Sequence, residues 1–301
     1  EDPEIQALAR DPEVAALVEN GDTLRLLAHP GFRRVVSRVM EKPEVVGAVH
    51  ADYFRAGATV ATTNTYAIHR DRLQKVGMDA QFEMLHRTAC EIAVFSRDNA
   101  GGGQVAGSLG PLGGSYQPEN TPEVEDAARL YAEIVALHAP YVVLYLIETA
   151  SSLRAARGAV AGCEASDKPV WLAVSVEDND GSKLRSGEAV TDVLDIAGID
   201  ALLINCTRPE AVTTALSELT GATVPLGAYA NGFTHIKERF RKPGATVDAL
   251  EARHDLGPTE YLDHSRDWAR LGASIIGGCC EVGPVHIAAL TAHFHTGAHP
   301  S

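Results

Sequence analysis

Residues 122–162, PEVEDAARLYAEIVALHAPYVVLYLIETASSLRAARGAVAG, hold the pattern that decides the fold. A helix-like stretch over Pro122–Leu137 leads into the apolar run Tyr141–Ile147, and a second helix-like stretch follows over Ser152–Gly162. Short apolar runs that alternate with longer amphipathic segments are typical of βα units around a parallel sheet. We therefore expect helix, buried strand and helix in this part of the chain.

The same alternation extends in both directions from this stretch. The predicted strands are Ala58–Thr62, Gln104–Leu109, Tyr141–Ile147, Val170–Val176, Asp200–Ile204, Val224–Ala228 and Ala273–Ile276. Further helix-like stretches are Pro43–Arg55, Glu188–Ala197, Pro209–Leu219, Pro258–Leu271 and Pro284–Ala292. Several of them open with Pro at the first helical position, where the missing N–H costs nothing.

The fold class that this pattern favours is α/β, as a single (β/α)8 TIM barrel over residues 1–301. Closing the barrel needs an eighth strand, and the weak run Ala15–Val18 is the best candidate for the first one. A doubly wound open sheet is the alternative architecture. It is disfavoured because no glycine fingerprint for a dinucleotide follows the first strand.

Composition excludes several classes of protein. With 40 acidic and 26 basic residues the formal charge is −14, and no dense Lys/Arg cluster is present, so nucleic acid is not an expected partner. No apolar run approaches the roughly 18–20 residues that span a bilayer, and residues 1–4 lack the features of a signal peptide. We expect a cytoplasmic protein with no membrane contact. Whether it forms a homo-oligomer stays open.

Cysteines supply the first chemical signal. Cys206 ends one predicted strand, and the adjacent Cys279 and Cys280 follow another strand after a Gly-Gly pair. Because active sites of (β/α)8 barrels form at the carboxyl ends of the strands, the three thiols can meet there, and three thiolates suit a Zn²⁺ ion with one open position. A buried structural role, common for cysteine, is the alternative, and we favour it only for Cys90 and Cys163 in the helical stretches.

Charged residues near the strand ends supply a second signal. Glu148 directly follows the buried run 142–147, so it must meet a partner or face a pocket. Its partner could be a cationic substrate group such as the ammonium of an amino acid. The competing interpretation is a salt bridge between Glu148 and a neighbouring Arg. Lys183 and Arg185 lie in the loop after the next run and could bind a carboxylate, although loop charges are usually solvated.

Polar and glycine motifs recur where the predicted strands end. They are Asn205-Cys206, Gly277-Gly278-Cys279-Cys280 followed by Pro284 and His286, Thr63-Asn64-Thr65-Tyr66, Ser108-Leu109-Gly110-Pro111, Glu148-Thr149 and Ser186-Gly187-Glu188. Taken together, these motifs resemble the homocysteine S-methyltransferase family. The resemblance runs from Pro43 to Leu290 and leaves residues 1–40 poorly matched. The double cysteine combined with the earlier Asn-Cys is its specific part.

This resemblance implies a (β/α)8 barrel that holds zinc on its three strand-end cysteines and forms methionine from homocysteine. Glu148 would be the catalytic-site residue that holds the homocysteine amino group, and Asn64 and Thr65 would line the pocket. At the end of the first strand the family usually has Asp-Gly followed by Gly-Thr, which helps to bind the amino acid. Here Asn20-Gly21-Asp22-Thr23-Leu24 is the nearest match, so Asn20 and Gly21 are the substrate-binding candidates. The departure bears on the substrate more than on the fold.

The expected chemistry is methyl transfer to a thiol. Little of a free alkyl thiol is ionised at pH 7, whereas a metal-bound thiol is deprotonated and becomes a ready nucleophile. The donor would be a small sulfonium or quaternary ammonium compound, for which Tyr66, Tyr116, Tyr229 and Phe233 offer aromatic faces. Two other classes stay open: a non-catalytic or altered-substrate barrel that binds zinc or a thiol, and, less favoured for lack of a general base, a zinc hydrolase.

Overall fold

The structure is a computed structural model, and it describes residues 43–75, 77–236 and 250–295. The predicted first strand Ala15–Val18 and the substrate-binding candidates Asn20 and Gly21 lie outside the described residues. Within the described ranges no helix is both long enough and apolar enough to cross a membrane.

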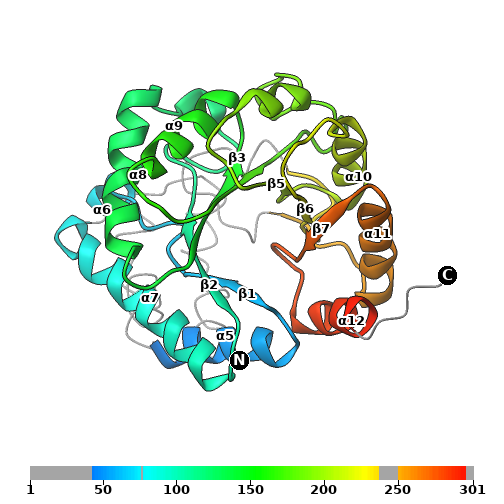
Figure 1. Cartoon of the computed structure of the whole chain (residues 1–301), viewed down its shortest axis with the longest axis horizontal. Coiled ribbons are helices and arrows are strands. Elements are labelled where there is room, and N and C mark those ends of the chain that lie inside the picture. Colours follow the sequence, from blue (N-terminus) through cyan, green and yellow to red (C-terminus); the bar gives the residue numbers. More distant parts are fainter. Residues whose placement is uncertain (1–42, 76, 237–249, 296–301) are drawn as a thin grey trace, which may run out of the picture.

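A parallel sheet forms the centre of the molecule (Figure 1). Its strands are β1 (Val60–Thr62), β2 (Gln104–Leu109), β3 (Leu144–Ala150), β4 (Val170–Val174), β5 (Ala201–Asn205), β6 (Leu226–Tyr229) and β7 (Ala273–Ile276). Each strand pairs in parallel with the next one along the chain, so the spatial order is β1 to β7. This sequential order in a curled parallel sheet confirms the predicted (β/α)8 barrel class.

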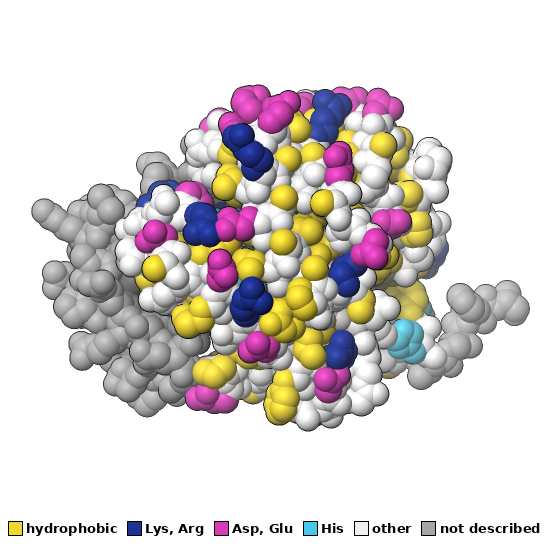
Figure 2. Space-filling view, turned by 60° about the vertical axis from the view of Figure 1, so that its left-hand side comes forward, with side chains coloured by type: hydrophobic (Ala, Val, Ile, Leu, Met, Phe, Trp, Pro, Cys, Tyr) yellow, Lys and Arg dark blue, Asp and Glu magenta, His cyan; other side chains and the backbone are white. Residues whose placement is uncertain are grey.

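Helices surround the sheet on its outer side (Figure 1). They are α5 (Pro43–Arg55), α6 (Arg70–Lys75), α7 (Phe82–Asn99), α8 (Val124–His138), α9 (Leu153–Cys163), α10 (Pro209–Glu218), α11 (Pro258–Arg270) and α12 (Pro284–Phe294). The first and last of these are neighbours: Thr291 of α12 lies against Gly57, just after α5, and the Tyr53 hydroxyl of α5 donates to the Val282 carbonyl over 2.9 Å. The outer surface carries acidic and basic side chains interspersed with apolar ones (Figure 2).

From β2 to β6, alternate residues of a strand belong to different apolar clusters, as the pleat of a strand requires. Ala106, Leu144, Leu146 and Leu203 pack with one another in a small cluster on the inner face of the curled sheet. Their sequence neighbours, such as Tyr145, pack in a much larger cluster between the sheet and the helices. Polar residues two positions beyond an inner residue therefore point into the mouth of the barrel.

Two predicted strands, Gln104–Leu109 and Ala273–Ile276, have the observed bounds, but the predicted helix Glu188–Ala197 is wrong. This segment forms only the short 3-10 helix η3 (Val190–Asp195). An antiparallel bridge between Lys183 and Ala189 keeps the chain extended up to residue 189, and Gly198 with φ 81° turns it toward β5. Little chain is left between these two points, so a longer α-helix does not fit.

Candidate active site

Three cysteine sulfurs meet at the carboxyl ends of the strands. Cys206 follows β5, whereas Cys279 and Cys280 follow β7, and their Sγ atoms all lie within 4.8 Å of one another. The Cys206 and Cys279 sulfurs are 2.8 Å apart, and those of Cys279 and Cys280 are 3.9 Å apart. The sulfurs converge as the sequence suggested, and among the described residues they are the one group with metal-ligand geometry. Metal binding itself stays a prediction.

Local backbone geometry explains how adjacent cysteines share one site. A Cβ atom on Gly278 would lie 2.2 Å from the Val282 side chain, so only glycine allows the chain to turn here. The Cys279 N–H donates to the Ala230 carbonyl over 3.0 Å, and the Cys280 carbonyl accepts from Gly232 over 2.8 Å. The loop after β6 therefore holds the double cysteine in place from both sides.

Cys206 has a less common backbone conformation, with φ 51°. Non-glycine residues rarely adopt the left-handed region, and they keep it only where surrounding contacts hold them. The Cys206 N–H donates to the Tyr229 carbonyl over 3.2 Å, and the residue is 4% exposed. With this conformation the backbone leaves the extended geometry of β5 at Cys206, where the three sulfurs meet.

Proximity divides the ionisation of the three thiols unequally. Hydrogen bonds from Cys206, and to a lesser extent from Cys279, lower the pKa of Cys280 below its ordinary value. The pKa of Cys279 is raised by the neighbouring Cys206 and Cys280 and by burial. The pKa of Cys206 is raised overall. The hydrogen bond with Cys279 lowers it, but Cys280 and burial together raise it by more. One thiolate is thus stabilised by its neighbours, while three together would repel one another unless a cation joined them.

Glu148 points into the barrel mouth, two residues beyond the inner residue Leu146. Its carboxylate accepts a hydrogen bond from the Ser108 hydroxyl over 2.5 Å, while part of its surface stays accessible. Burial raises the pKa of Glu148 to about 7, the Ser108 hydrogen bond opposes the shift, and Cys206 adds to it. Within the described ranges no Arg or Lys forms an ion pair with Glu148, so a salt bridge does not account for it there.

The two pocket candidates after β1 differ in their surroundings. Asn64 is exposed, whereas Thr65 is 1% exposed. The Thr65 hydroxyl donates to the Ser108 carbonyl over 2.8 Å, and the Ser108 N–H donates to the Thr63 hydroxyl over 3.0 Å. The Thr65 side chain therefore holds Ser108 in position. Because the Thr65 hydroxyl donates its proton to the Ser108 carbonyl, it has none to donate to a ligand.

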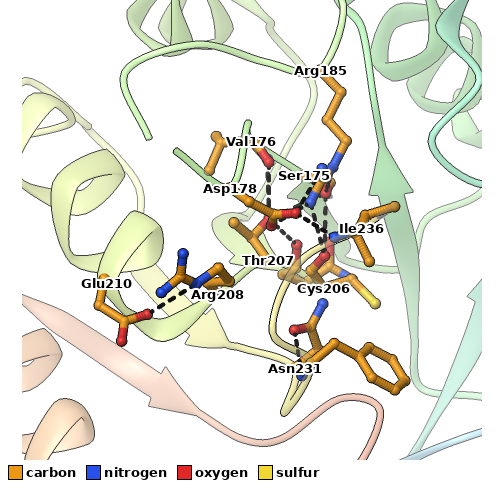
Figure 3. A network of polar contacts seen from close by, with 12 residues as sticks. Ser175, Val176, Asp178, Arg185, Cys206, Thr207, Arg208, Glu210, Asn231 and Ile236 are labelled. Atoms are coloured by element: carbon orange, nitrogen blue, oxygen red, sulfur yellow. Dashed lines mark hydrogen bonds and ion pairs between the residues drawn. The ribbon is translucent and has the colours of Figure 1, made fainter. Parts of the chain in front are cut away.

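Arg185 is not a solvated loop residue, and Figure 3 shows its polar contacts. Its side chain is 1% exposed and forms an ion pair with Asp178 over 2.9 Å, and Nε donates to the Ser175 hydroxyl over 2.8 Å. The sequence predicts that Arg185 could bind a carboxylate, but it identifies neither Asp178 nor Ser175 as a partner. The sequence does hold a signal, because polar Ser175 directly follows β4 and acidic Asp178 lies a short way further along the same loop. The companion candidate, Lys183, instead pairs at the surface with Asp180 over 2.7 Å.

The remaining cysteines behave as the sequence suggested. Cys90 in α7 and Cys163 in α9 are unpaired and buried, with exposed fractions of 0% and 2%. Burial raises the pKa of each thiol to about 12. Both therefore stay protonated at neutral pH, as structural cysteines do.

At its carboxyl end the parallel barrel brings together three cysteine sulfurs and a partly accessible carboxylate. The chain belongs to the homocysteine S-methyltransferase family, whose family model matches residues 15–294. It is 30% identical over 276 residues to "Homocysteine S-methyltransferase" of Escherichia coli, covering 84% of this chain and 86% of that one. Its identity to "Homocysteine S-methyltransferase YbgG" of Bacillus subtilis is 26% over 280 residues, covering 84% of this chain and 85% of the relative.

Solved structures show the same likeness. The metallated form of the homocysteine methyltransferase MmuM from Escherichia coli superposes with a TM-score of 0.70 at 28% identity, covering 85% of this chain and 87% of that one. The oxidized form of the same protein gives a TM-score of 0.71 at 28% identity, with the same coverage.

Proposed function

We propose that this chain transfers a methyl group from a small sulfonium or quaternary ammonium compound to the thiol of homocysteine, giving methionine. The proposal depends on one observation above all: three sulfurs within 4.8 Å of one another lie in the same barrel mouth as the Ser108–Glu148 pair. The sulfurs provide a metal site, and the carboxylate provides a partner for the ammonium of an amino acid. The family relationship supports both assignments.

The sulfur cluster fits zinc, and we propose Cys206, Cys279 and Cys280 as its ligands. Tetrahedral zinc with Zn–S bonds of about 2.3 Å holds its sulfurs about 3.8 Å apart, close to the 3.9 Å between Cys279 and Cys280. The Cys206 and Cys279 sulfurs are closer, at 2.8 Å, so binding would require this pair to open. Bound zinc would supply the deprotonation of the substrate thiol at neutral pH.

Glu148 would bind the homocysteine amino group. Its carboxylate is oriented by Ser108 and has no described cationic partner, so the ammonium of a substrate would satisfy it. Thr65 would act through Ser108, and Asn64 would lie at the rim. Asn20 and Gly21 are proposed to contact the amino acid from the first strand of a single barrel domain that spans residues 1–301.

The methyl donor would bind among aromatic side chains. Tyr116 and Phe233 pack in one cluster with Cys206, and Tyr229 packs against Cys279 on the inner face of the sheet. The Tyr229 hydroxyl is buried and has no hydrogen-bond partner among the described residues, so it is available to a bound substrate. Aromatic faces favour sulfonium and quaternary ammonium cations. Methyl transfer forms a bond from the thiolate sulfur to the methyl carbon and releases the donor as a neutral sulfide or amine, so no acid is needed.

The test combines metal analysis with an activity panel. The purified chain would be loaded with zinc and given homocysteine with S-methylmethionine, S-adenosylmethionine, betaine or dimethylsulfoniopropionate, and methionine would be measured. We expect one zinc per chain and methionine from at least one donor. Cys206→Ala should lose both, whereas the matched buried cysteine variant Cys163→Ala should keep both.

A zinc-loaded chain that binds homocysteine but makes no methionine from any donor would favour the non-catalytic alternative. A chain that takes up no zinc would contradict the metal assignment.

A further inference from the structure

Arg185 is buried in a way that stability alone does not explain. Its side chain is 1% exposed and that of its partner Asp178 is 7% exposed, whereas the other ion pairs of the described residues are far more open. Removing two charges from water costs several kcal/mol for each ion, and a buried pair seldom stabilises a fold more than apolar residues would. We therefore expect this buried pair, which lies beside the sulfur cluster, to hold a neighbouring group in position.

The guanidinium group reaches the backbone of a proposed metal ligand. Its Nη2 atom donates to Asp178 Oδ1 over 2.9 Å and contacts the Cys206 carbonyl oxygen over 3.4 Å. Its Nε atom donates to the Ser175 hydroxyl over 2.8 Å, and that hydroxyl lies 3.4 Å from the same carbonyl oxygen (Figure 3). Two donors thus converge on the carbonyl of the residue that has the left-handed φ of 51°.

The same guanidinium group also stacks on a tyrosine that contacts the Cys206 sulfur. The Arg185 guanidinium carbon lies 4.7 Å from the centroid of the Tyr116 ring, and Tyr116 is 3% exposed. The Tyr116 side chain is hydrogen-bonded to the Cys206 thiol and packs with it in one apolar cluster. Arg185 therefore acts on Cys206 at two places, its carbonyl oxygen and, through Tyr116, its sulfur.

Asp178 fixes the guanidinium group itself. Its Oδ2 atom accepts the Ile236 N–H over 2.7 Å, while its Oδ1 atom accepts from Arg185. The carboxylate thereby joins the loop after β4, which carries Arg185, to the loop after β6. Cys206 lies on the strand end between these two loops.

We propose that Arg185, held by Asp178, is a positioning residue that sets the backbone and sulfur of Cys206 for metal binding. The planar guanidinium fork is what the task needs, because one group must meet a carboxylate, a carbonyl, a hydroxyl and a ring face at fixed angles. Lysine carries the same charge without that geometry. The inference rests on the proposed function only in that it takes the three sulfurs as metal ligands.

Arg185→Lys in the full chain tests the proposal through metal binding. Outer-shell contacts to a ligand typically change metal affinity by about 10–100-fold, so we expect the zinc dissociation constant, measured by chelator competition, to rise by that factor. The cobalt(II)-loaded variant should also show a weaker or shifted thiolate-to-metal charge-transfer band. A merely structural defect would lower the melting temperature without changing the band of the folded fraction.

Arg70→Lys is the matched control. Arg70 also pairs with a carboxylate, that of Glu133, and its guanidinium carbon lies 4.2 Å from the Phe82 ring centroid, but it belongs to the outer helix layer. Its loss should leave zinc affinity and the cobalt spectrum unchanged. If Arg185→Lys also keeps the affinity and spectrum of the unmodified chain, the proposal is wrong.

If Arg185→Lys does not fold, Tyr116→Phe tests the proposal instead. This variant keeps the ring of residue 116 and removes only its hydroxyl. We expect its zinc affinity to fall and its cobalt band to shift, and unchanged values would overturn the proposed action on the sulfur. These readouts need no methyl transfer. A chain that binds cobalt through thiolates but makes no methionine would contradict the proposed function without contradicting this inference.

Discussion

Asn205 binds Thr149 through both atoms of its side-chain amide. Its Nδ2 atom donates to the Thr149 hydroxyl over 3.1 Å, and its Oδ1 atom accepts the Thr149 backbone N–H over 3.1 Å. Asn205 precedes Cys206, whereas Thr149 follows Glu148 and has the left-handed φ of 59°. One buried amide thus connects the strand end that carries a proposed metal ligand to the one that carries the proposed ammonium ligand.

Asn205→Ala should loosen this connection. Two buried groups of Thr149 lose their partner, which typically costs about 1–3 kcal/mol for each unsatisfied group. We expect a lower free energy of unfolding in urea and, because Glu148 is less firmly placed, a higher KM for homocysteine. Thr149→Ser keeps the hydroxyl and the N–H, so it should retain homocysteine binding. An Asn205→Ala chain with unchanged stability would show that the amide is not the link.

Glu148→Gln should weaken homocysteine binding while the fold stays intact. A hydrogen bond to a charged group contributes about 1.5–3 kcal/mol, so KM for homocysteine should rise about 10–100-fold. The KM of the methyl donor serves as the internal control, because the aromatic donor site that we propose does not include Glu148. If KM for homocysteine does not change, Glu148 does not hold the amino group.

The raised pKa of Glu148, about 7, adds a pH signature to this variant. Between its ordinary value of 4.5 and about 7 the folded chain keeps a proton that the unfolded chain has lost, so this group's contribution to stability falls as pH rises through that window. Homocysteine binding should instead improve as pH rises through 7, because the carboxylate form is needed. The Gln variant should show neither dependence.

Two buried histidines should make the fold sensitive to acid. His86 Nε2 lies 3.1 Å from the Ile68 carbonyl oxygen and donates to it, so His86 Nδ1 accepts from His138 Nε2 over 2.9 Å. Both rings are neutral, because burial lowers the pKa of His86 to about 4 and that of His138 to about 3. Unfolded histidines take up protons near pH 6.5, so the unfolded chain binds more protons and stability falls as pH falls below that value.

We expect His138→Gln to reduce this pH dependence. One fewer buried histidine should lower the slope of unfolding free energy against pH by about 1.4 kcal/mol per pH unit between pH 6 and 4. Urea denaturation at several pH values measures the slope, and glutamine can still donate to His86. An identical slope in both chains would mean that His138 is already protonated in the fold.

Gly278→Ala should damage the metal site through the backbone. The new Cβ atom would lie 2.2 Å from the Val282 side chain, so the turn that carries Cys279 and Cys280 must move. Overpacking of this kind costs about 1–3 kcal/mol, and we expect a lower melting temperature together with lost or weakened zinc binding. At the adjacent Gly277 a Cβ atom would make only an ordinary 3.5 Å contact with Tyr229, so Gly277→Ala should bind zinc normally.

Much of the barrel could be predicted because its signals are local. Strand bounds such as Gln104–Leu109 follow from a short run, rich in small and apolar residues, that lies between turn residues. The segment 188–197 was mispredicted because an antiparallel bridge, a contact outside the segment, keeps its start extended. The burial of Arg185 could not be predicted either, because the sequence does not distinguish a solvated loop arginine from one that is 1% exposed.

The α/β class and the placement of Cys206, Cys279 and Cys280 at strand ends follow from periodicity and motif order along the chain. The folded chain was needed to bring three sulfurs within 4.8 Å, to pair Glu148 with Ser108 and to bury Arg185 beside Cys206. Those relationships depend on how the strands are curled and how their loops pack. Distance and desolvation arise when separate segments meet, so no single stretch of sequence specifies them.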